Sequence, residues 1–119
     1  MHDTITYHFP YPPSVNHYWG QRGNLRFVGK AGKLFREEVA IIALKRTESL
    51  YNARLKLEVY LYPPDKRKRD IDNNMKSLLD AMEHAGVYEN DSQIDELHIY
   101  RGETTKGGAC KVILSSLNA

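Results

Sequence analysis

The stretch LKLEVYLYPP, from Leu55 to Pro64, carries the clearest strand pattern in the chain. Leucine and valine occupy every second position, and lysine, glutamate and tyrosine fill the positions between them. Successive side chains of a strand point to opposite faces, so this alternation predicts a strand with one face on a hydrophobic core. Two prolines end the strand because proline cannot donate a backbone hydrogen bond to a sheet. We therefore expect a sheet with one buried face.

The sequence on either side of this strand also shows the residue spacings that are typical of strands and helices. Apolar residues recur at every second position in the predicted strands and at three- or four-residue spacing in the predicted helices. The pattern predicts strands at 4–9, 94–101 and 109–115, and helices at 30–46 and from 70 or 71 to 85.

The connections between these elements set the predicted fold class. Gly86 is placed to end the second helix in the left-handed conformation, and Lys106-Gly107-Gly108 is predicted to join the last two strands as a hairpin turn. The resulting order is β, α, β, α, β, β. This order predicts a two-layer α+β fold, with residues 1–119 as a single domain.

Residues 10–29 lack a long periodic pattern and are predicted to be an irregular binding loop. The segment contains several prolines and glycines together with Tyr18, Trp19 and Phe27. Long loops in small domains are commonly functional, and aromatic side chains argue against a fully solvated tether. The three aromatic residues either pack in the core or an interface, or stack on unpaired bases.

Composition restricts the class of protein. The chain has 119 residues, 41% of them hydrophobic, which suffices for one modest core. It contains no apolar run of about eighteen residues and does not begin like a secretion signal, so we expect a cytoplasmic protein with no membrane partner. Cys110 is the single cysteine and the histidines have no zinc-ligand spacing with it, so we expect neither an internal disulfide nor zinc.

The charges are unevenly distributed, although the net charge is only +2. Five cations and no acid lie between Gln21 and Arg36, and four consecutive cations occupy residues 66–69. Between Glu83 and Glu103 there are six acids and one cation. Acidic and basic segments in one small domain suit a site that holds a metal ion and also binds phosphates.

The segment KRKRDIDNNMK, from Lys66 to Lys76, joins the basic run to two aspartates. Asp72 would share one helix flank with Lys76 and Asp80, whereas a helical Asp70 would point about 160° away from Asp72. If Asp70 instead precedes the first turn in an extended conformation, its carboxylate can turn toward Asp72 near the helix start.

Two adjacent carboxylates repel each other unless a cation lies between them. Mg²⁺ suits such a pair because it takes oxygen ligands, keeps several waters and bridges carboxylates to substrate phosphates. Asp91 follows the second predicted helix after a turn and is a candidate third ligand. Lys76 would neutralise charge in the transition state or orient the attacking water.

Structural roles also explain each of these residues. Asp70 could cap the helix, Asp72 could be a first-turn acid favoured by the helix dipole, and Asp91 could be a turn residue. Lys76 could pair with Asp72 or Asp80 one turn away. The basic run could be a solvated loop, although its position directly before the acids favours phosphate contact.

Four short elements of the chain resemble the RusA family of Holliday-junction resolvases, in the family's order. They are Pro12-Pro13-Ser14-Val15-Asn16; Arg69-Asp70-Ile71-Asp72-Asn73 with Lys76, Asp80-Ala81 and Ala85-Gly86; Asn90-Asp91-Ser92-Gln93-Ile94; and Thr105-Lys106-Gly107-Gly108. One such motif would be weak evidence, but four in order over nearly the whole chain are specific. Asn90 departs from the pattern, because close relatives often have a second acid there.

The resemblance implies a homodimeric, magnesium-dependent endonuclease without an organic cofactor. Such an enzyme resolves four-way (Holliday) junctions by paired cuts, in DNA recombination and repair. Position by position, it implies metal binding by Asp70, Asp72 and Asp91, and catalysis by these three with Lys76. DNA contacts are expected from Lys66, Arg67, Lys68, Arg69, Asn16 and Lys106. A homodimer also matches the two-fold symmetry of a four-way junction.

Two alternatives remain at the level of sequence. One is a magnesium-dependent nuclease acting on other branched DNA, such as flaps or forks. The other is a DNA-binding or regulatory module whose aspartates are only caps and turn residues.

Overall fold

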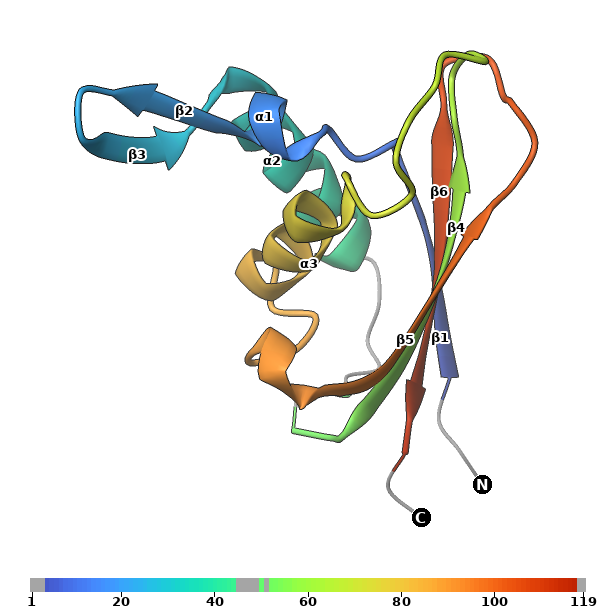
Figure 1. The fold of residues 1–119 in the computed structure, drawn as a ribbon. Coiled ribbons are helices and arrows are strands. Elements are labelled where there is room, and N and C mark those ends of the chain that lie inside the picture. The colour runs from blue at the N-terminus through green and yellow to red at the C-terminus, as the bar shows by residue number, and fades with distance from the viewer. Residues whose placement is uncertain (1–3, 45–49, 51, 118–119) are drawn as a thin grey trace.

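The computed structural model describes residues 4–44, 50 and 52–117 and has a mixed α+β fold (Figure 1). Its longer elements are β1 (Thr4–Phe9), α2 (Lys30–Leu44), β4 (Leu55–Tyr62), α3 (Met75–His84), β5 (Ile94–Arg101) and β6 (Ala109–Ser116). The short elements are α1 (Val15–Tyr18), β2 (Trp19–Arg22), β3 (Leu25–Val28) and η1 (Asp91–Gln93). The predicted α+β class is confirmed, whereas the predicted element order is incomplete because it omits the four short elements.

The four long strands form one sheet in the order β1-β6-β4-β5. β6 is antiparallel to both β1 and β4, and β5 is parallel to β4 at the open edge of the sheet. The predicted hairpin between β5 and β6 is therefore wrong, because β4 lies between them. Gly107 and Gly108 do form a turn with positive φ, but the connection crosses the end of β4, where Thr105 N–H donates to the Pro63 carbonyl.

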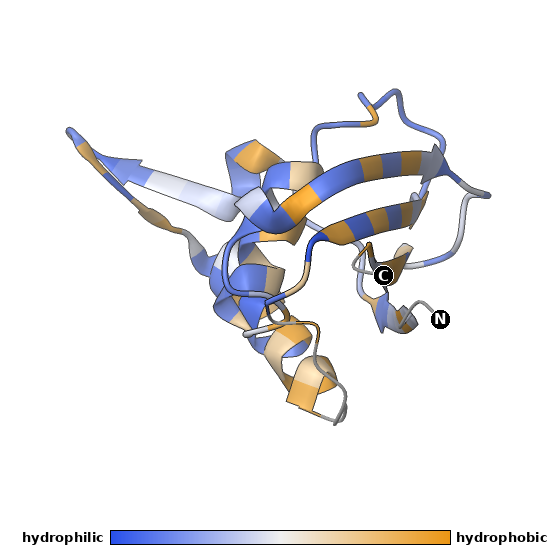
Figure 2. Ribbon diagram, turned by 90° about the horizontal axis from the view of Figure 1, so that it is seen from below, coloured by the Kyte–Doolittle hydropathy of each residue, from blue (hydrophilic) through white to orange (hydrophobic). Residues whose placement is uncertain are grey.

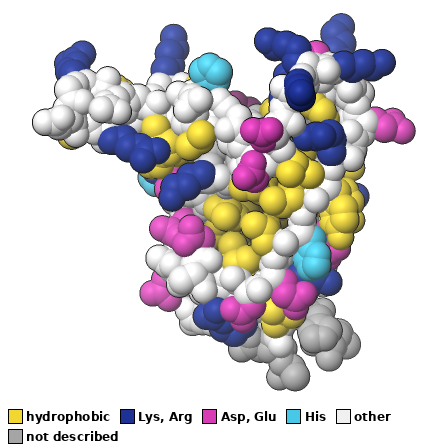
Figure 3. Space-filling model, in the orientation of Figure 1, with side chains coloured by type: hydrophobic (Ala, Val, Ile, Leu, Met, Phe, Trp, Pro, Cys, Tyr) yellow, Lys and Arg dark blue, Asp and Glu magenta, His cyan; other side chains and the backbone are white. Residues whose placement is uncertain are grey.

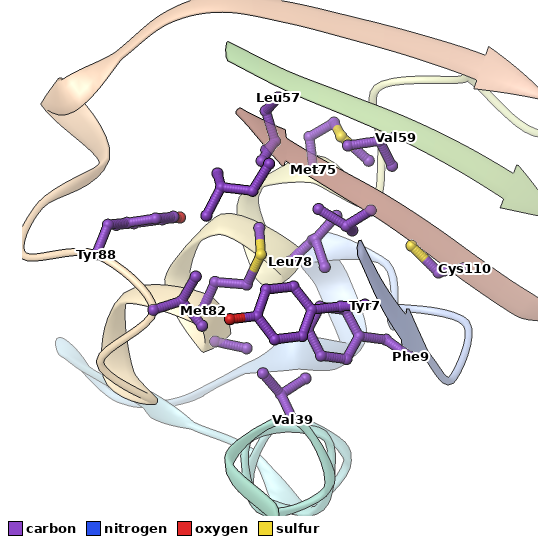
Figure 4. Packing of buried hydrophobic residues seen from close by; sticks show 14 of the residues in the cluster. Tyr7, Phe9, Val39, Leu57, Val59, Met75, Leu78, Met82, Tyr88 and Cys110 are labelled. Atoms are coloured by element: carbon purple, nitrogen blue, oxygen red, sulfur yellow. The ribbon is translucent and has the colours of Figure 1, made fainter. Parts of the chain in front are cut away.

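The core lies between one face of the sheet and helices α2 and α3. The buried positions of β4 are the predicted ones, Leu55, Leu57, Val59 and Leu61, and the hydropathy colours alternate along the strands (Figure 2). Figure 4 shows Met75, Leu78 and Met82 of α3 in this core, with Val39 of α2 beside the stacked rings of Tyr7 and Phe9. Packing against the sheet fixes the direction of α3, and with it the turn that precedes the helix.

Helix α3 ends as predicted but begins later than predicted. Gly86 has φ +79°, and the N–H groups of Gly86 and Val87 donate to the carbonyls of Glu83 and Met82. These bonds satisfy the free carbonyls at the helix end. At the other end, residues 71–74 form a turn, and regular helix starts at Met75. Short polar side chains such as those of residues 72–74 favour turns over helix, which accounts for the late start.

The prediction of an irregular segment at residues 10–29 is wrong for its second half. Helix α1 is followed by β2 and β3, which pair with each other as an antiparallel hairpin. Each strand has only four residues, too few for a clear alternating pattern. The predicted helix at 30–46 is confirmed to Leu44, and its last two residues lie outside the described residues.

Candidate active site

Asp70 and Asp72 lie on the chain segment that connects β4 to the start of α3. Asp70 precedes the turn at 71–74 and is not helical, which is the condition that the sequence set for its carboxylate to turn toward Asp72. Asp72 lies within that turn, so the expectation that it shares a helix flank with Lys76 and Asp80 is wrong. The carbonyl of Asp70 accepts from Asn73 N–H (3.3 Å) and that of Asp72 from Met75 N–H (3.1 Å). Both aspartates are exposed.

The structure does not support a capping role for these two aspartates. The N-cap of α3 is Asn74, and its side chain makes no capping hydrogen bond to the backbone of the first helical turn. The Asn74 side chain instead donates to the Pro12 carbonyl at 2.7 Å. Helix capping therefore does not explain why acids stand at positions 70 and 72.

The segment Pro12–Asn16, here called the proline element, packs directly on Asp70 and the turn at 71–74, here called the acidic turn. Besides the bond from Asn74 to Pro12, Ser77 Oγ donates to the Pro13 carbonyl (2.6 Å), and Val15 N–H donates to the Asn73 carbonyl (3.1 Å). Two elements some 60 positions apart, for example 62 between Pro12 and Asn74, thus form one local structure. The predicted DNA contact Asn16 is exposed on α1, beside the same turn.

Two of the four residues of the basic run before Asp70 make contacts within their own loop. Arg69 and Arg67 both form ion pairs with Asp65, and together they hold the pKa of that carboxyl well below its usual range. Arg69 is also held through its carbonyl, which accepts from Arg101 Nη2 at 2.7 Å. Lys66 and Lys68 are exposed and make no ion pair within the described part of the chain. The loop is thus ordered by its arginines, and its lysines face solvent.

Lys106 lies at the same end of the sheet as the basic run. The bond from Thr105 N–H to the Pro63 carbonyl (2.8 Å) brings its turn against the residues that end β4. Gly108 packs closely on Tyr11, where a Cβ atom would approach the Tyr11 side chain to 2.7 Å. Lys106 is exposed and so free to contact a ligand.

An open cleft of about 570 Å³ adjoins the acidic turn. Its walls come from the proline element, from α2 and from the basic run, and they include Ser14, His17, Glu38, Arg67, Lys68 and Asn73. Asp70, Asp72 and Asp91 do not line it. The cleft offers cations and hydrogen-bonding groups to a phosphate backbone passing beside the acidic turn.

Asp91 lies near the opposite end of α3. It begins η1, whose cap is a capping box made by Asn90 and Gln93, and its backbone N–H donates to Glu83 Oε1 at 2.9 Å. Asp72, in contrast, precedes the first residue of α3, so the two aspartates adjoin different parts of the helix. Among the described residues, no three acidic, histidine or cysteine side chains gather closely enough to hold a metal ion. The described residues thus do not bring Asp70, Asp72 and Asp91 together as one cluster.

The six described aspartates divide into two groups of three. Asp65, Asp80 and Asp95 each form an ion pair with arginine. Among the described residues, no side chain forms an ion pair or hydrogen bond with the carboxylates of Asp70, Asp72 or Asp91. The unpaired group is the set of predicted metal ligands.

Lys76 has no partner on its own helix. The predicted alternative of a pair with Asp80 is wrong, because Asp80 accepts hydrogen bonds from Arg36 Nη2 (2.7 Å) and from the Tyr18 hydroxyl. The other alternative, a pair with Asp72, is also not formed in the described structure. Lys76 is exposed one residue into α3, so its ammonium group can approach a ligand bound at the acidic turn.

Comparison with known proteins identifies the class of protein to which this chain belongs. Residues 10–113 match the family described as Endodeoxyribonuclease RusA. A crossover junction endodeoxyribonuclease of Enterobacteria phage HK97 is 37% identical over 111 residues, which is 92% of each chain. One of phage 82 is 30% identical, over 94% of this chain and 96% of its own, and one of Escherichia coli K12 is 28% identical over 97% of each.

The match over most of the chain defines the protein as an endodeoxyribonuclease by class. The chain belongs to the RusA family. In the part of the chain that the structure describes, no helix combines the length and apolar character needed to cross a membrane.

Proposed function

We propose that this chain is a magnesium-dependent endonuclease that resolves four-way DNA junctions in the cytoplasm during recombination and repair. The relatives named above are called crossover junction endodeoxyribonucleases, which supplies the substrate class. The observation that carries the proposal is the absence of a cationic partner, among the described residues, for the carboxylates of Asp70, Asp72 and Asp91, while the other described aspartates are paired.

The residues at the acidic turn fit Mg²⁺. This ion is commonly held by one or two carboxylates, with waters and substrate phosphates as its other ligands. Asp70 and Asp72 are exposed oxygen donors two positions apart, next to a loop and cleft rich in cations. When bound, Mg²⁺ would favour ionisation of a coordinated water and stabilise the charge that develops on the phosphate.

The protein's own residues would bind and orient the DNA. Lys66 and Lys68 would contact phosphates, with Asn16 and Lys106 on neighbouring surfaces, because all four are exposed around the acidic turn. Arg67 and Arg69 would act partly through their pairs with Asp65, which hold the loop in shape. Lys76 would place a positive charge beside the reacting phosphate.

A second copy of the chain would complete the site. Asp91 adjoins the last turn of α3 through Glu83 and Asp72 precedes its first residue, and the described residues include no group of three side chains that could hold a metal ion. A two-fold axis near the middle of α3 would bring Asp91 of one copy toward Asp70 and Asp72 of the other. The open edge strand β5 supplies apolar surface for such a dimer, because Leu97, on the same face of the sheet as buried Leu57, is 41% exposed.

The function is tested by incubating the wild-type protein with matched linear, forked, flapped and four-way DNA, with and without Mg²⁺. We expect metal-dependent, paired cuts in the four-way junction alone. Preferred cutting of flaps or forks would instead support a nuclease for other branched DNA. Binding without metal-dependent cutting of any substrate would leave a DNA-binding module.

The shared site is tested with a heterodimer of Asp70→Asn and Asp91→Asn chains, carrying different tags and purified through both. If each site draws on both chains, one site of the heterodimer is intact and the other lacks both carboxylates. The heterodimer should then nick one strand of a junction, whereas each homodimeric variant cuts neither. A heterodimer as inactive as its parents would contradict the shared site.

A further inference from the structure

The β2–β3 hairpin projects away from the body of the molecule. Its strands pair only with each other, through the registers Trp19–Val28 to Arg22–Leu25, and the tip is a turn at Gly23 and Asn24 (Figure 1). Gly23 has φ +60°, which a tight turn requires. The resolvase chemistry proposed above uses none of the hairpin residues, so this arm needs a separate explanation.

The hairpin presents apolar side chains to solvent next to a cation. Leu25 and Phe27 are 65% and 41% exposed. The register places both on the same face as Arg22, with the Phe27 ring lying over Gly20, where a Cβ atom would meet it at 2.5 Å. On the opposite face, the Arg26 guanidinium lies 4.6 Å from the centre of the Trp19 ring. Each face therefore combines positive charge with an apolar or aromatic surface.

The charge of this region is wholly positive. No acidic residue occurs between Thr4 and Arg36. Arg22, Arg26, Lys30 and Lys33 make no ion pair within the described part of the chain. Figure 3 shows Lys and Arg side chains both on the hairpin and at the end of the sheet, along one edge of the molecule, with acidic side chains between the two groups. A polyanion lying along this edge would meet both cationic groups.

The base of the hairpin is fixed to the helix that follows the acidic turn. Tyr18, fully buried, donates from its hydroxyl to Asp80 of α3, and Arg36 bonds to both of these side chains. Gly29 N–H, just beyond β3, donates to the Tyr18 carbonyl at 2.9 Å. The hairpin is therefore held in a defined direction relative to Asp70 and Asp72.

We propose that the hairpin contacts DNA at the branch point, with Arg22 and Arg26 on phosphates and Leu25 against a base face exposed there. The inference rests on the proposed junction activity. A branch point exposes base faces that stacking covers in a duplex, and exposed leucine and phenylalanine side chains can pack on such faces. The charge favours DNA over a protein partner, because the surface offers cations without acids.

The test measures binding to a four-way junction and to a matched duplex without metal, so that no cutting occurs. Arg22→Ala/Arg26→Ala should weaken both affinities about tenfold and lower the salt dependence of log K by about two. Lys56→Ala/Lys111→Ala is the matched control, since it removes two cations from the outer face of the sheet and should leave both affinities nearly unchanged. An equal loss in the control would overturn the assignment to the hairpin.

The role of the tip is tested separately with Leu25→Ala, which removes an exposed side chain and should not affect folding. This variant should lose several-fold affinity for the junction but not for the duplex. Wild type should also raise the fluorescence of 2-aminopurine placed at the branch point, and Leu25→Ala should not. The single tryptophan, Trp19, gives a second signal, because its emission should change when DNA displaces Arg26.

Two outcomes would overturn the proposal. Unchanged junction binding and 2-aminopurine fluorescence in both hairpin variants would exclude a DNA contact. A changed oligomeric state with unchanged DNA binding would show that the hairpin instead packs on a second copy. Failure of the wild type to cut any junction would reject the proposed function, but the metal-free binding measurements would still decide whether the hairpin contacts DNA.

Discussion

Asp80 and Asp72 lie near the same helix and differ in what surrounds them. Asp80, on the flank of α3, binds Arg36 and Tyr18 and joins three helices. Asp72, just before the first residue of α3, is exposed and has no cationic partner among the described residues. Asp80 therefore stabilises the fold, whereas the carboxylate of Asp72 remains available to bind a ligand from outside the chain.

The contrast matters because an unpaired acid next to another acid is unfavourable for the protein alone. Two close carboxylates repel, and the repulsion is relieved when a cation binds between them. The chain has arginines available, since it pairs them with Asp65, Asp80 and Asp95. Substitution of paired and unpaired aspartates therefore separates structural from catalytic roles.

The largest expected effect is the loss of cleavage in Asp70→Asn and in Asp72→Asn. Each should reduce the rate of junction cutting by about a thousandfold or more, because a metal ligand is lost. Junction binding should remain, since it depends on cations. Asp95→Asn is the matched control: it also removes one exposed carboxylate, but one paired with Arg54, and should cut normally. Near-normal cutting by both acidic-turn variants would remove the proposed site.

Lys76→Ala should have the next largest effect. Loss of a positive charge beside the reacting phosphate should slow cutting about a hundredfold, with little change in junction affinity. Lys66→Ala is the comparison, because a phosphate contact away from the chemistry should weaken binding more than it slows the bound complex. Single-turnover rates at saturating protein separate the two cases. A normal rate for the bound Lys76→Ala complex would assign Lys76 to binding alone.

The long elements could be predicted from sequence because each has a local pattern. Strand β4 alternates over eight residues, and α3 carries an apolar stripe that ends at Gly86. The hairpin lacked such a signal, because its strands have four residues each and face solvent for most of their length. The order of the strands in the sheet also could not be predicted, because local sequence patterns do not determine it. The turn at Lys106 was predicted correctly. However, no sequence pattern near this turn indicates that β4 would lie between β5 and β6, the strands that the turn connects.

The site was predictable only in part for the same reason. Asp70 and Asp72 are close in sequence, so their relation follows from the local geometry of one turn. The partner of Asp80 is Arg36, 44 positions away, and no spacing rule points to it. Asp91 was expected to approach the other two aspartates, and its position at the far end of α3 depends on the whole fold.

The paired aspartate should matter more for stability than the unpaired one. Asp80→Asn removes the charge that holds Arg36 and accepts from buried Tyr18, and should lower the free energy of unfolding by about 2 kcal/mol, since the pair is partly exposed. Asp72→Asn without metal should leave the melting temperature unchanged or raise it. Thermal unfolding of both variants, followed by circular dichroism, tests the contrast. A melting temperature that falls equally in both would contradict it.

The smallest expected effect concerns Asp65 and is visible as pH dependence. Its bonds to Arg69 and Arg67 lower its pKa in the folded protein, so their stabilisation is present above the unfolded pKa of about 4 and is lost as pH falls through the folded value. Asp65→Asn should therefore be less stable than wild type near neutral pH, with a difference that shrinks below about pH 4. Urea unfolding of both proteins across this range measures the difference. Because the pair is exposed, the difference should be well below that of Asp80→Asn, and it should shrink further in high salt. A difference independent of pH would mean that Asp65 acts through its backbone or packing, and that pairing with arginine does not distinguish it from Asp70 and Asp72.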